Sequence, residues 1–338
     1  MSAMNSTSSV PVQPLIQIRD LSKTFVLGKS VVRQMLGRKV DVLRAVHHVN
    51  LNIYPGECLG LVGESGCGKT TLGRCILRLY ESDSGQVLME GKDFLKMNGG
   101  EIQKMRRKMQ VVFQDPYSSL NPRMSIGAML NEVNLVHGIC KSSEVDERVS
   151  ELLHTVGLAP EIAERLPHEL SGGQRQRVGL ARALAVNPSF IVADEPVSAL
   201  DVSIQAQVIN LLVELQEKLH LTMLFITHDL RLVRYISHRV AVMYLGSIVE
   251  IAPSDLLFSN PMHPYTKALL AAAPVIDPHR RARTVAIKGE PPNPINIPAA
   301  CCPFRPRCEL AMGRCEKEYP ELKEVESGHF VSCFAVNA

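Results

Sequence analysis

Residues 63–71 read Gly-Glu-Ser-Gly-Cys-Gly-Lys-Thr-Thr, and this stretch decides the fold. An apolar run from Leu59 to Val62 precedes it, and a helical pattern from Thr70 to Tyr80 follows, so the order is strand, glycine turn, helix. Glycines let the backbone curl until several N–H groups point at one anion, and the helix N-terminus adds positive potential. The stretch fits G-x-x-x-x-G-K-[ST] at every position and predicts a nucleotide phosphate loop.

Two side chains of this loop have expected roles of their own. The Lys69 ammonium is expected to reach the β- and γ-phosphates of ATP, and the Thr70 hydroxyl to hold Mg²⁺. The thiol of Cys67 is expected to play no part in binding, which the backbone carries out. A thiol exposed beside a helix N-terminus can nevertheless have a lowered pKa, so we expect thiol-modifying reagents to inhibit ATP turnover and ATP to protect. The residues predicted to bind nucleotide here are Gly63, Glu64, Ser65, Gly66, Cys67, Gly68, Lys69, Thr70 and Thr71.

An acidic pair follows the next strongly apolar strand, at residues 190–193. A buried strand delivers its last side chains to the edge of the sheet where α/β folds bind ligands. Asp194 is therefore predicted to anchor Mg²⁺, and Glu195 to polarise the attacking water. The alternative, two solvated acids at a strand end, is weakened by the phosphate loop upstream.

A second helix start of unusual composition lies at residues 170–177, Leu-Ser-Gly-Gly-Gln-Arg-Gln-Arg. Ser171 can cap the helix, and Gly172 and Gly173 expose backbone N–H groups. This predicts a second phosphate-binding helix N-terminus, with Gln174 beside it.

Together these motifs resemble the ABC ATPases over at least residues 15–260. The resemblance implies an α/β fold: a RecA-like P-loop ATPase core, an antiparallel β subdomain and an inserted α-helical subdomain, plus a Cys-containing C-terminal extension. It implies that residues 170–174 face the phosphate loop of a second subunit. The expected boundaries are a disordered N-terminal tail at 1–14, an ATPase domain at 15–259 with its helical subdomain at about 117–183, and the extension at 260–338.

The same resemblance assigns the remaining site residues. Gln114 matches the glutamine that contacts Mg²⁺ or water, and so becomes a third predicted Mg²⁺ contact beside Thr70 and Asp194. His228 matches the histidine near the γ-phosphate, and Asp201 matches the aspartate loop that follows the acidic pair. Phe25 stands where the family carries an aromatic ring against adenine, although an aromatic residue on a strand is also an ordinary core residue.

A narrower resemblance is to the ATPase subunits of bacterial dipeptide and oligopeptide importers, and within them to the F-type subunit of dipeptide permeases. It rests on residues 113–123, 194–207 and 260–270, the last reading Asn-Pro-Met-His-Pro-Tyr-Thr-Lys-Ala-Leu-Leu. Nickel importers are similar in the motor region, and the cysteine tail favours peptides over nickel. Haem also stays open as cargo.

Five of the nine cysteines lie between Cys301 and Cys333. Four thiolates suit either zinc or an iron–sulfur cluster, and the usual C-x₂-C zinc spacing is absent. The resemblance implies a [4Fe–4S] cluster on Cys302, Cys308, Cys315 and Cys333, with the part played by Cys301 open. Reduced structural cysteines are the alternative.

Composition limits the partners. The net charge of +3 comes without a long basic run, so no nucleic-acid partner is expected. We find no secretion signal and no stretch of ~18 apolar residues, and we expect a peripheral protein at the cytoplasmic face of the inner membrane.

The family implies three kinds of partner: a second, paralogous ATPase subunit, two transmembrane permease subunits and an external substrate-binding protein. A non-transport ABC ATPase is the main rival class, but such proteins usually carry two cassettes or long coiled-coil insertions. A phosphate-loop GTPase or small kinase would leave residues 170–177 unexplained.

Overall fold

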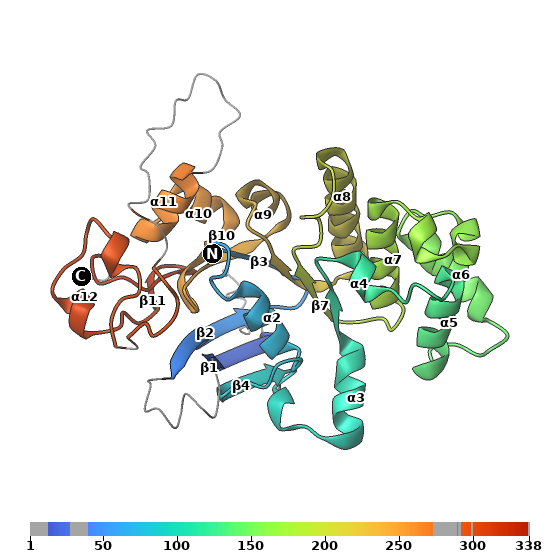
Figure 1. The fold of residues 1–338 in the computed structure, drawn as a ribbon, viewed down its shortest axis with the longest axis horizontal. Helices are drawn as coiled ribbons and strands as arrows, with labels where there is room; N and C mark the ends of the chain where they lie inside the picture. Colours follow the sequence, from blue (N-terminus) through green and yellow to red (C-terminus); the bar gives the residue numbers. More distant parts are fainter. Residues whose placement is uncertain (1–12, 28–39, 273–288, 290–291, 299, 337–338) are drawn as a thin grey trace, which may run out of the picture.

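The computed structural model describes residues 13–27, 40–272, 289, 292–298 and 300–336. Two sheets form the centre, a helical unit lies at one end of the long axis, and the C-terminal tail lies at the other end (Figure 1). Most of the predicted disordered N-terminal tail falls outside the described residues.

The larger sheet has the strand order β11-β12-β10-β9-β3-β8-β7-β6 among the described residues. Its strands are β3 (Cys58–Val62), β6 (Met109–Val112), β7 (Phe190–Asp194), β8 (Thr222–Ile226), β9 (Arg239–Tyr244), β10 (Ser247–Pro253), β11 (Lys323–Glu326) and β12 (His329–Val331). The strands from β9 to β6 run parallel, and the other three are antiparallel. Every residue of β3, β7 and β8 is buried, as a parallel sheet covered on both faces requires.

The smaller sheet is antiparallel and has the order β2-β1-β4-β5. Its strands are β1 (Ile16–Leu27), β2 (Asp41–Ile53), β4 (Ser84–Met89) and β5 (Lys92–Asp93). Its apolar side chains share one hydrophobic core with α2 (Lys69–Ile76) and with one face of the larger sheet. Alternate residues of β3 and β7 point into this core or into the core on the opposite face, because strand side chains alternate between the two faces.

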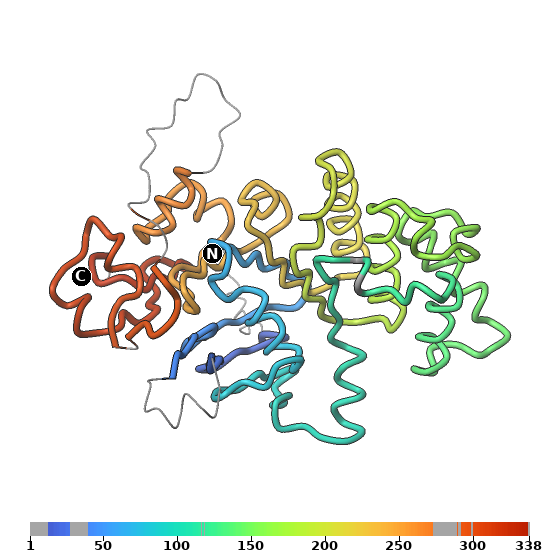
Figure 2. Tube along the Cα trace, in the orientation of Figure 1, coloured from blue at the N-terminus to red at the C-terminus, as the bar shows by residue number. Residues whose placement is uncertain are grey.

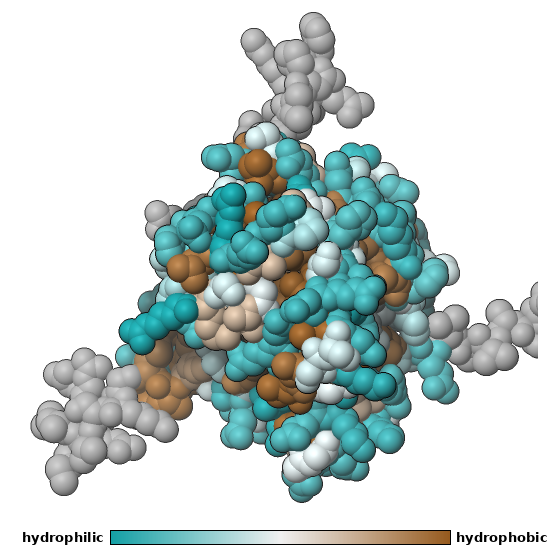
Figure 3. All heavy atoms as spheres, turned by 90° about the vertical axis from the view of Figure 1, so that its right-hand side faces the viewer, coloured by the Kyte–Doolittle hydropathy of each residue, from teal (hydrophilic) through white to brown (hydrophobic). Residues whose placement is uncertain are grey.

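The helical unit is inserted between β6 and β7, which pair directly with each other. It contains α4 (Pro116–Ser119), α5 (Ile126–Val136), α6 (Val145–Thr155), η2 (Pro160–Glu164), η3 (Pro167–Glu169) and α7 (Gly172–Leu184). The Ser125 hydroxyl accepts the Ala128 N–H at 3.2 Å and starts α5. The outward face of this end of the molecule is mainly hydrophilic, with scattered hydrophobic side chains (Figure 3).

Of the remaining helices, η1 (Phe94–Lys96) packs against β4 of the smaller sheet, and the others lie against the larger sheet, at its edge or in the tail. Those others are α3 (Gly99–Lys108), α8 (Val202–Leu219), α9 (Leu230–Ile236), α10 (Ser254–Ser259), α11 (Pro264–Ala272), η4 (Arg305–Arg307) and α12 (Arg314–Lys317). The chain beyond residue 259 is therefore not only irregular, as its prolines suggested. It includes α11, and its last strands join the larger sheet.

The C-terminal hairpin extends the larger sheet at β10. Phe330 lies opposite Ile251, so residues far apart in sequence run side by side (Figure 2). β10 is almost wholly buried, and its free edge needs hydrogen-bond partners that water cannot supply. A strand of only three residues carries too little pattern to be predicted from the sequence.

A buried carboxylate joins this tail to the sheet. Glu250 of β10 is fully buried and accepts the N–H groups of Met262 at 2.7 Å and His263 at 3.0 Å. Its other contact is His329 Nε2 of β12, at 2.7 Å. A buried carboxylate needs such partners, so Glu250 holds both the start of α11 and β12 in place.

His263 makes the folded protein sensitive to acid. Burial lowers its pKa from 6.5 to about 3, although a hydrogen bond to the Ser332 backbone opposes this. In the unfolded chain the same imidazole takes up a proton near its ordinary pKa of 6.5. The free energy of unfolding is therefore unaffected by this group above that pH. Between pH 6.5 and about 3 it falls by about 1.4 kcal/mol per pH unit, because the unfolded chain is protonated there and the folded one is not.

We therefore expect His263→Asn to flatten the acid side of the stability profile. The asparagine oxygen can still accept the Tyr265 N–H, which the histidine Nδ1 accepts at 3.0 Å. Urea unfolding between pH 7.5 and 5.0 measures the difference, with wild-type protein as the reference. Parallel pH profiles for the two proteins would contradict this account.

Candidate active site

The phosphate loop joins the end of β3 to α2. Gly68 precedes α2 with φ of 109°, and a Cβ at this position would lie 2.0 Å from the Ala45 carbonyl oxygen. Only glycine fits this conformation and this approach. The sheet and β2 therefore shape the loop from two sides.

Lys69 points back into the loop. Its buried ammonium donates to the Gly63 carbonyl at 2.8 Å and to the Glu64 carbonyl at 3.0 Å. These bonds keep the positive charge within the curl of the loop, beside the N-terminus of α2. This is the geometry that an anionic phosphate requires.

The two residues predicted to anchor Mg²⁺ meet across the loop. The Thr70 hydroxyl donates to Asp194 Oδ1 at 2.9 Å. Burial raises the pKa of Asp194, while the hydrogen bond from Thr70 opposes the rise. A hydroxyl and a carboxylate at this separation are hard oxygen donors that suit Mg²⁺.

Three further predicted residues converge on one carboxylate. Gln114, Glu195 and His228 follow the neighbouring parallel strands β6, β7 and β8. Gln114 Nε2 donates to Glu195 Oε2 at 3.3 Å, and His228 Nδ1 lies 3.2 Å from Oε1. The Glu195 backbone is held at φ of 46°, and its N–H donates to the Ile226 carbonyl at 2.9 Å. A carboxylate held on both sides in this way can orient a water molecule.

Residues 170–174 begin α7 as the sequence predicts. The Ser171 hydroxyl accepts the Gln174 N–H at 3.3 Å, and Gln174 Oε1 accepts the Ser171 N–H at 3.0 Å. Gly173 has a packing role that the sequence did not reveal, because a Cβ there would lie 2.4 Å from Ile204 Cγ2 of α8. Ser171 is exposed, and α7 lies well apart from α2 in Figure 1. Contact between this helix tip and the phosphate loop of a second chain stays a prediction.

Asp201 and Phe25 are the two remaining residues that the sequence assigns to the site. Asp201 directly precedes α8, and its side chain makes no capping hydrogen bond there. Phe25 is half-buried and packs edge-to-face on Tyr80, with ring centroids 5.7 Å apart. Its assignment to adenine stays a prediction.

Sequence reasoning missed the residues that hold Glu64. Its carboxylate forms an ion pair with Arg307 of η4, and its N–H donates to the Tyr265 hydroxyl at 2.9 Å. Both partners belong to the chain beyond residue 259. Tyr265 lies in the family segment 260–270, but nothing in that segment points to the phosphate loop, and no motif marks Arg307.

Two family models match separate parts of the chain. Residues 46–198 match "ABC transporter", and residues 249–315 match "Oligopeptide/dipeptide transporter, C-terminal region". A protein named "Probable peptide ABC transporter ATP-binding protein y4tS", from Sinorhizobium fredii, is 52% identical over 94% of this chain and 89% of its own length. "Oligopeptide transport ATP-binding protein AppF" from Bacillus subtilis is 48% identical over 95% of this chain and 97% of its own length.

The chain belongs to the ABC transporter ATPase family. A solved structure agrees: "Dimeric structure of a post-hydrolysis state of the ATP-binding cassette MJ0796 bound to ADP and Pi" has a TM-score of 0.60 and 30% identity, and it covers 71% of this chain and 98% of that one. The predicted fold class and the predicted class of ATP-binding, ATP-hydrolysing enzyme are both confirmed.

The cysteines of this ABC ATPase tail lie near one another without forming a metal site. Burial is the main cause that raises the pKa of Cys302, to about 11, and of Cys308 and Cys333. The nearby Cys315 raises the pKa of all three, so the four thiols gather in one region. Among the described residues, however, no group of three or more His, Cys, Asp or Glu side chains is arranged to hold a metal ion. The iron–sulfur prediction is therefore not supported by the geometry.

Cys67 corrects another expectation. The thiol is 3% exposed rather than open to solvent, and burial raises its pKa. The nearby Lys69 ammonium acts in the opposite direction but is the weaker cause. Burial thus outweighs the nearby positive charge, and the expected exposure and lowered pKa of Cys67 are wrong.

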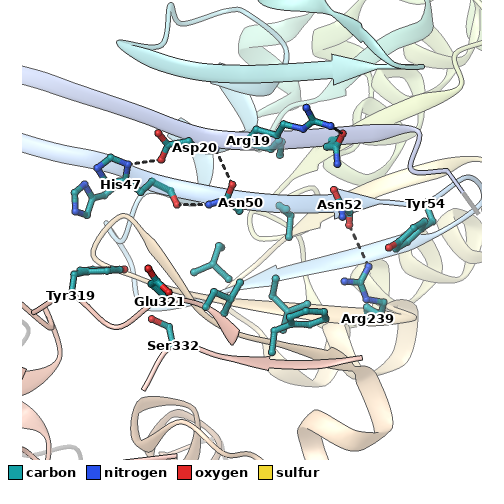
Figure 4. Close-up of a pocket in the computed structure, with 18 of the residues that line it drawn as sticks. Arg19, Asp20, His47, Asn50, Asn52, Tyr54, Arg239, Tyr319, Glu321 and Ser332 are labelled. Atoms are coloured by element: carbon teal, nitrogen blue, oxygen red, sulfur yellow. Dashed lines mark hydrogen bonds and ion pairs between the residues drawn. The ribbon is translucent and has the colours of Figure 1, made fainter. Parts of the chain in front are cut away.

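A cavity of about 880 Å³ opens away from the phosphate loop, between the β1–β2 pair and the tail (Figure 4). Asp20 and His47 face it from one side, and Tyr319 and Glu321 face it from the other. None of residues 63–71 lines it, so it is not part of the nucleotide site.

In the part of the chain that the structure describes, no helix has the length and apolar character to cross a membrane.

The state of Cys67 gives a direct prediction. Because thiolate is the reactive form, iodoacetamide at neutral pH should alkylate Cys67 at least about tenfold more slowly than the half-buried Cys301. Mass spectrometry of peptides from briefly treated protein measures both rates, with urea-denatured protein as the control. Equal rates in the folded protein would contradict the burial of this thiol.

Proposed function

We propose that this ABC ATPase hydrolyses ATP to drive import of dipeptides or oligopeptides across the cell membrane. The carrying observation is the convergence of Gln114 and His228 on Glu195, beside the Thr70–Asp194 pair. That arrangement supports hydrolysis as well as binding. The peptide cargo is supported by the names of the relatives and by the tail match.

Each residue has a defined part in this proposal. Lys69 and the loop N–H groups bind the phosphates, and Asp194 and Thr70 would hold Mg²⁺, which neutralises charge on the phosphate oxygens when bound. Glu195 orients or deprotonates the attacking water, and Gln114 and His228 keep its carboxylate in place.

Two ATPase subunits are needed for a complete site. Ser171 and the N-terminus of α7 would face the terminal phosphate held by the partner, so ATP closes the pair and hydrolysis releases it. Closure would move two transmembrane permease subunits between inward- and outward-facing states. An external binding protein would deliver the peptide, and a paralogue is the proposed ATPase partner.

The protein would lie on the cytoplasmic face of the membrane, held there by the permeases. The proposed domain division, with the ATPase domain at 15–259 and the extension at 260–338, follows the same family. The tail nonetheless contributes strands to the ATPase sheet.

Variants of Glu195 and Lys69 separate hydrolysis from binding. Glu195→Gln keeps the shape but removes the basic carboxylate, so turnover should fall about 10²–10⁴-fold while ATP still binds. Lys69→Ala removes the main cation of the loop and should abolish binding. Steady-state ATPase rates and calorimetric ATP titrations measure both effects, and uptake of labelled dipeptide by cells carrying each variant should fail.

Glu214→Gln is the matched control, because Glu214 lies exposed on α8 and pairs with Lys218 of the same helix. It should behave as wild type. Wild-type turnover in the Glu195→Gln protein would reject the assigned role. Unchanged uptake of labelled dipeptide in cells whose Glu195→Gln or Lys69→Ala protein has lost ATPase activity would reject the peptide cargo.

We further propose that Cys302, Cys308, Cys315 and Cys333 take a [4Fe–4S] cluster in the cell. The proposal rests on the four tail cysteines as a possible set of thiolate ligands and on the family resemblance, not on their arrangement in the structure. Zinc or reduced thiols are the alternatives. Protein purified without oxygen should contain about four irons and four sulfides per chain, with a broad absorbance near 400 nm.

Replacement of Cys315 by Ser should remove this iron, whereas replacement of Cys140, outside the tail, should not. Stoichiometric zinc in the anaerobic protein would replace the cluster with a zinc site. Protein free of any metal would leave the cysteines as structural thiols.

A further inference from the structure

The tail reaches the phosphate loop through a buried arginine. Arg307 is 8% exposed, and its two terminal nitrogens donate to the two Glu64 oxygens at 2.9 and 3.1 Å. This is a two-pronged bond between a guanidinium and a carboxylate, in which both geometry and charge are matched. It joins residues that are 243 positions apart in the chain.

Arg307 stands on a packed aromatic platform. Tyr244 at the end of β9 lies 4.6 Å from Tyr265 and 5.2 Å from Phe304, measured between ring centroids. All three rings are buried, and Arg307 lies 6.0 Å from the Tyr244 centroid. The platform fixes where the guanidinium can be, because packed rings leave little room for movement.

The same platform holds the Glu64 backbone. The Tyr265 hydroxyl accepts the Glu64 N–H at 2.9 Å, and on the opposite side of this peptide segment the Glu64 carbonyl accepts Lys69 Nζ at 3.0 Å. Glu64 is therefore tied both to the tail and to the lysine that is proposed to bind phosphate.

The charge of Glu64 makes this arrangement consequential. A carboxylate one residue after Gly63 lies next to the site where the triphosphate would bind, and like charges repel strongly where water is partly excluded. Paired with Arg307, the carboxylate is neutralised and turned toward the tail. Left alone, it would be free to oppose the nucleotide.

We propose that Arg307 is a positioning residue of the ATP site, acting through Glu64 to keep the phosphate loop in its binding geometry. The tail is then part of the nucleotide site, and ATP affinity is coupled to the state of the tail. This inference rests on the proposed function, since it supposes that the loop binds ATP.

A double-mutant cycle tests the pair. The four proteins are wild type, Arg307→Met, Glu64→Gln and the double variant, with ATP dissociation constants measured by calorimetry in the Glu195→Gln background. Arg307→Met should weaken ATP binding roughly tenfold, because it exposes the unpaired carboxylate. In the Glu64→Gln background the same change should alter affinity less than about twofold.

Steady-state kinetics provide a second readout that a purely structural role would not produce. With Glu195 intact, Arg307→Met should raise KM about tenfold and leave kcat within about threefold of wild type. Arg307→Lys keeps the charge but loses the two-pronged geometry, so its KM should lie between those of wild type and Arg307→Met. It also provides a test if the Arg307→Met protein fails to fold.

Arg305→Met is the matched control. Arg305 lies on the same short helix and pairs with Glu316 inside the tail. It should leave KM and affinity unchanged, with thermal unfolding reporting on the fold of every variant.

Two results would overturn the inference: wild-type ATP affinity in both Arg307 variants, or an equal loss of affinity with and without the Glu64 carboxylate. Failure of the wild-type protein to bind ATP would instead refute the proposed function.

Discussion

The parallel pairing of β3, β8, β7 and β6 is the constraint on which the rest of the molecule depends. Parallel strands bring their carboxyl ends to one edge of the sheet, so the phosphate loop, the acidic pair, Gln114 and His228 meet there. The hydrogen bond from Thr70 to Asp194 and the two contacts to Glu195 are consequences of this order. The helical unit is a long connection between two strands of that sheet, and it can carry Ser171 far from the loop without disturbing the edge.

Sequence reasoning succeeded where a signal is local. Apolar runs predicted β3 and β7 to within one residue, and the motifs at residues 63–71 and 194–195 placed their side chains correctly on loop and strand end. Sequence reasoning failed where a residue's conformation or contacts depend on a neighbour that is distant in the sequence. β12 has three residues and forms because β10 offers an edge, and Arg307 is held by Glu64 across most of the chain. Neither interaction leaves a periodic pattern that a single sequence can show.

Burial explains one expectation that was wrong and one role that the sequence did not reveal. A thiol at the position of Cys67 was expected to have a lowered pKa because it lies at a helix N-terminus. Burial has the larger effect: the thiol is removed from water, and this raises its pKa. The glycine at position 173 was expected to expose its N–H group, yet it also lets α7 approach Ile204. In both cases the sequence correctly placed the residue at or just before the start of a helix. What surrounds the residue depends on tertiary packing, which the local sequence does not show.

The tail is bound to the ATPase core by charge as well as by strand pairing. Two core carboxylates, Glu250 and Glu64, pair with His329 and Arg307 of the tail. A carboxylate buried as deeply as Glu250 and deprived of its donors would be destabilising by several kcal/mol. Without the tail, the Glu250 carboxylate would be either exposed to water or buried without its ionic partner. The two regions therefore fold as one structure, and the phosphate loop responds to whatever alters the tail, because one of these two ion pairs ends on the loop itself.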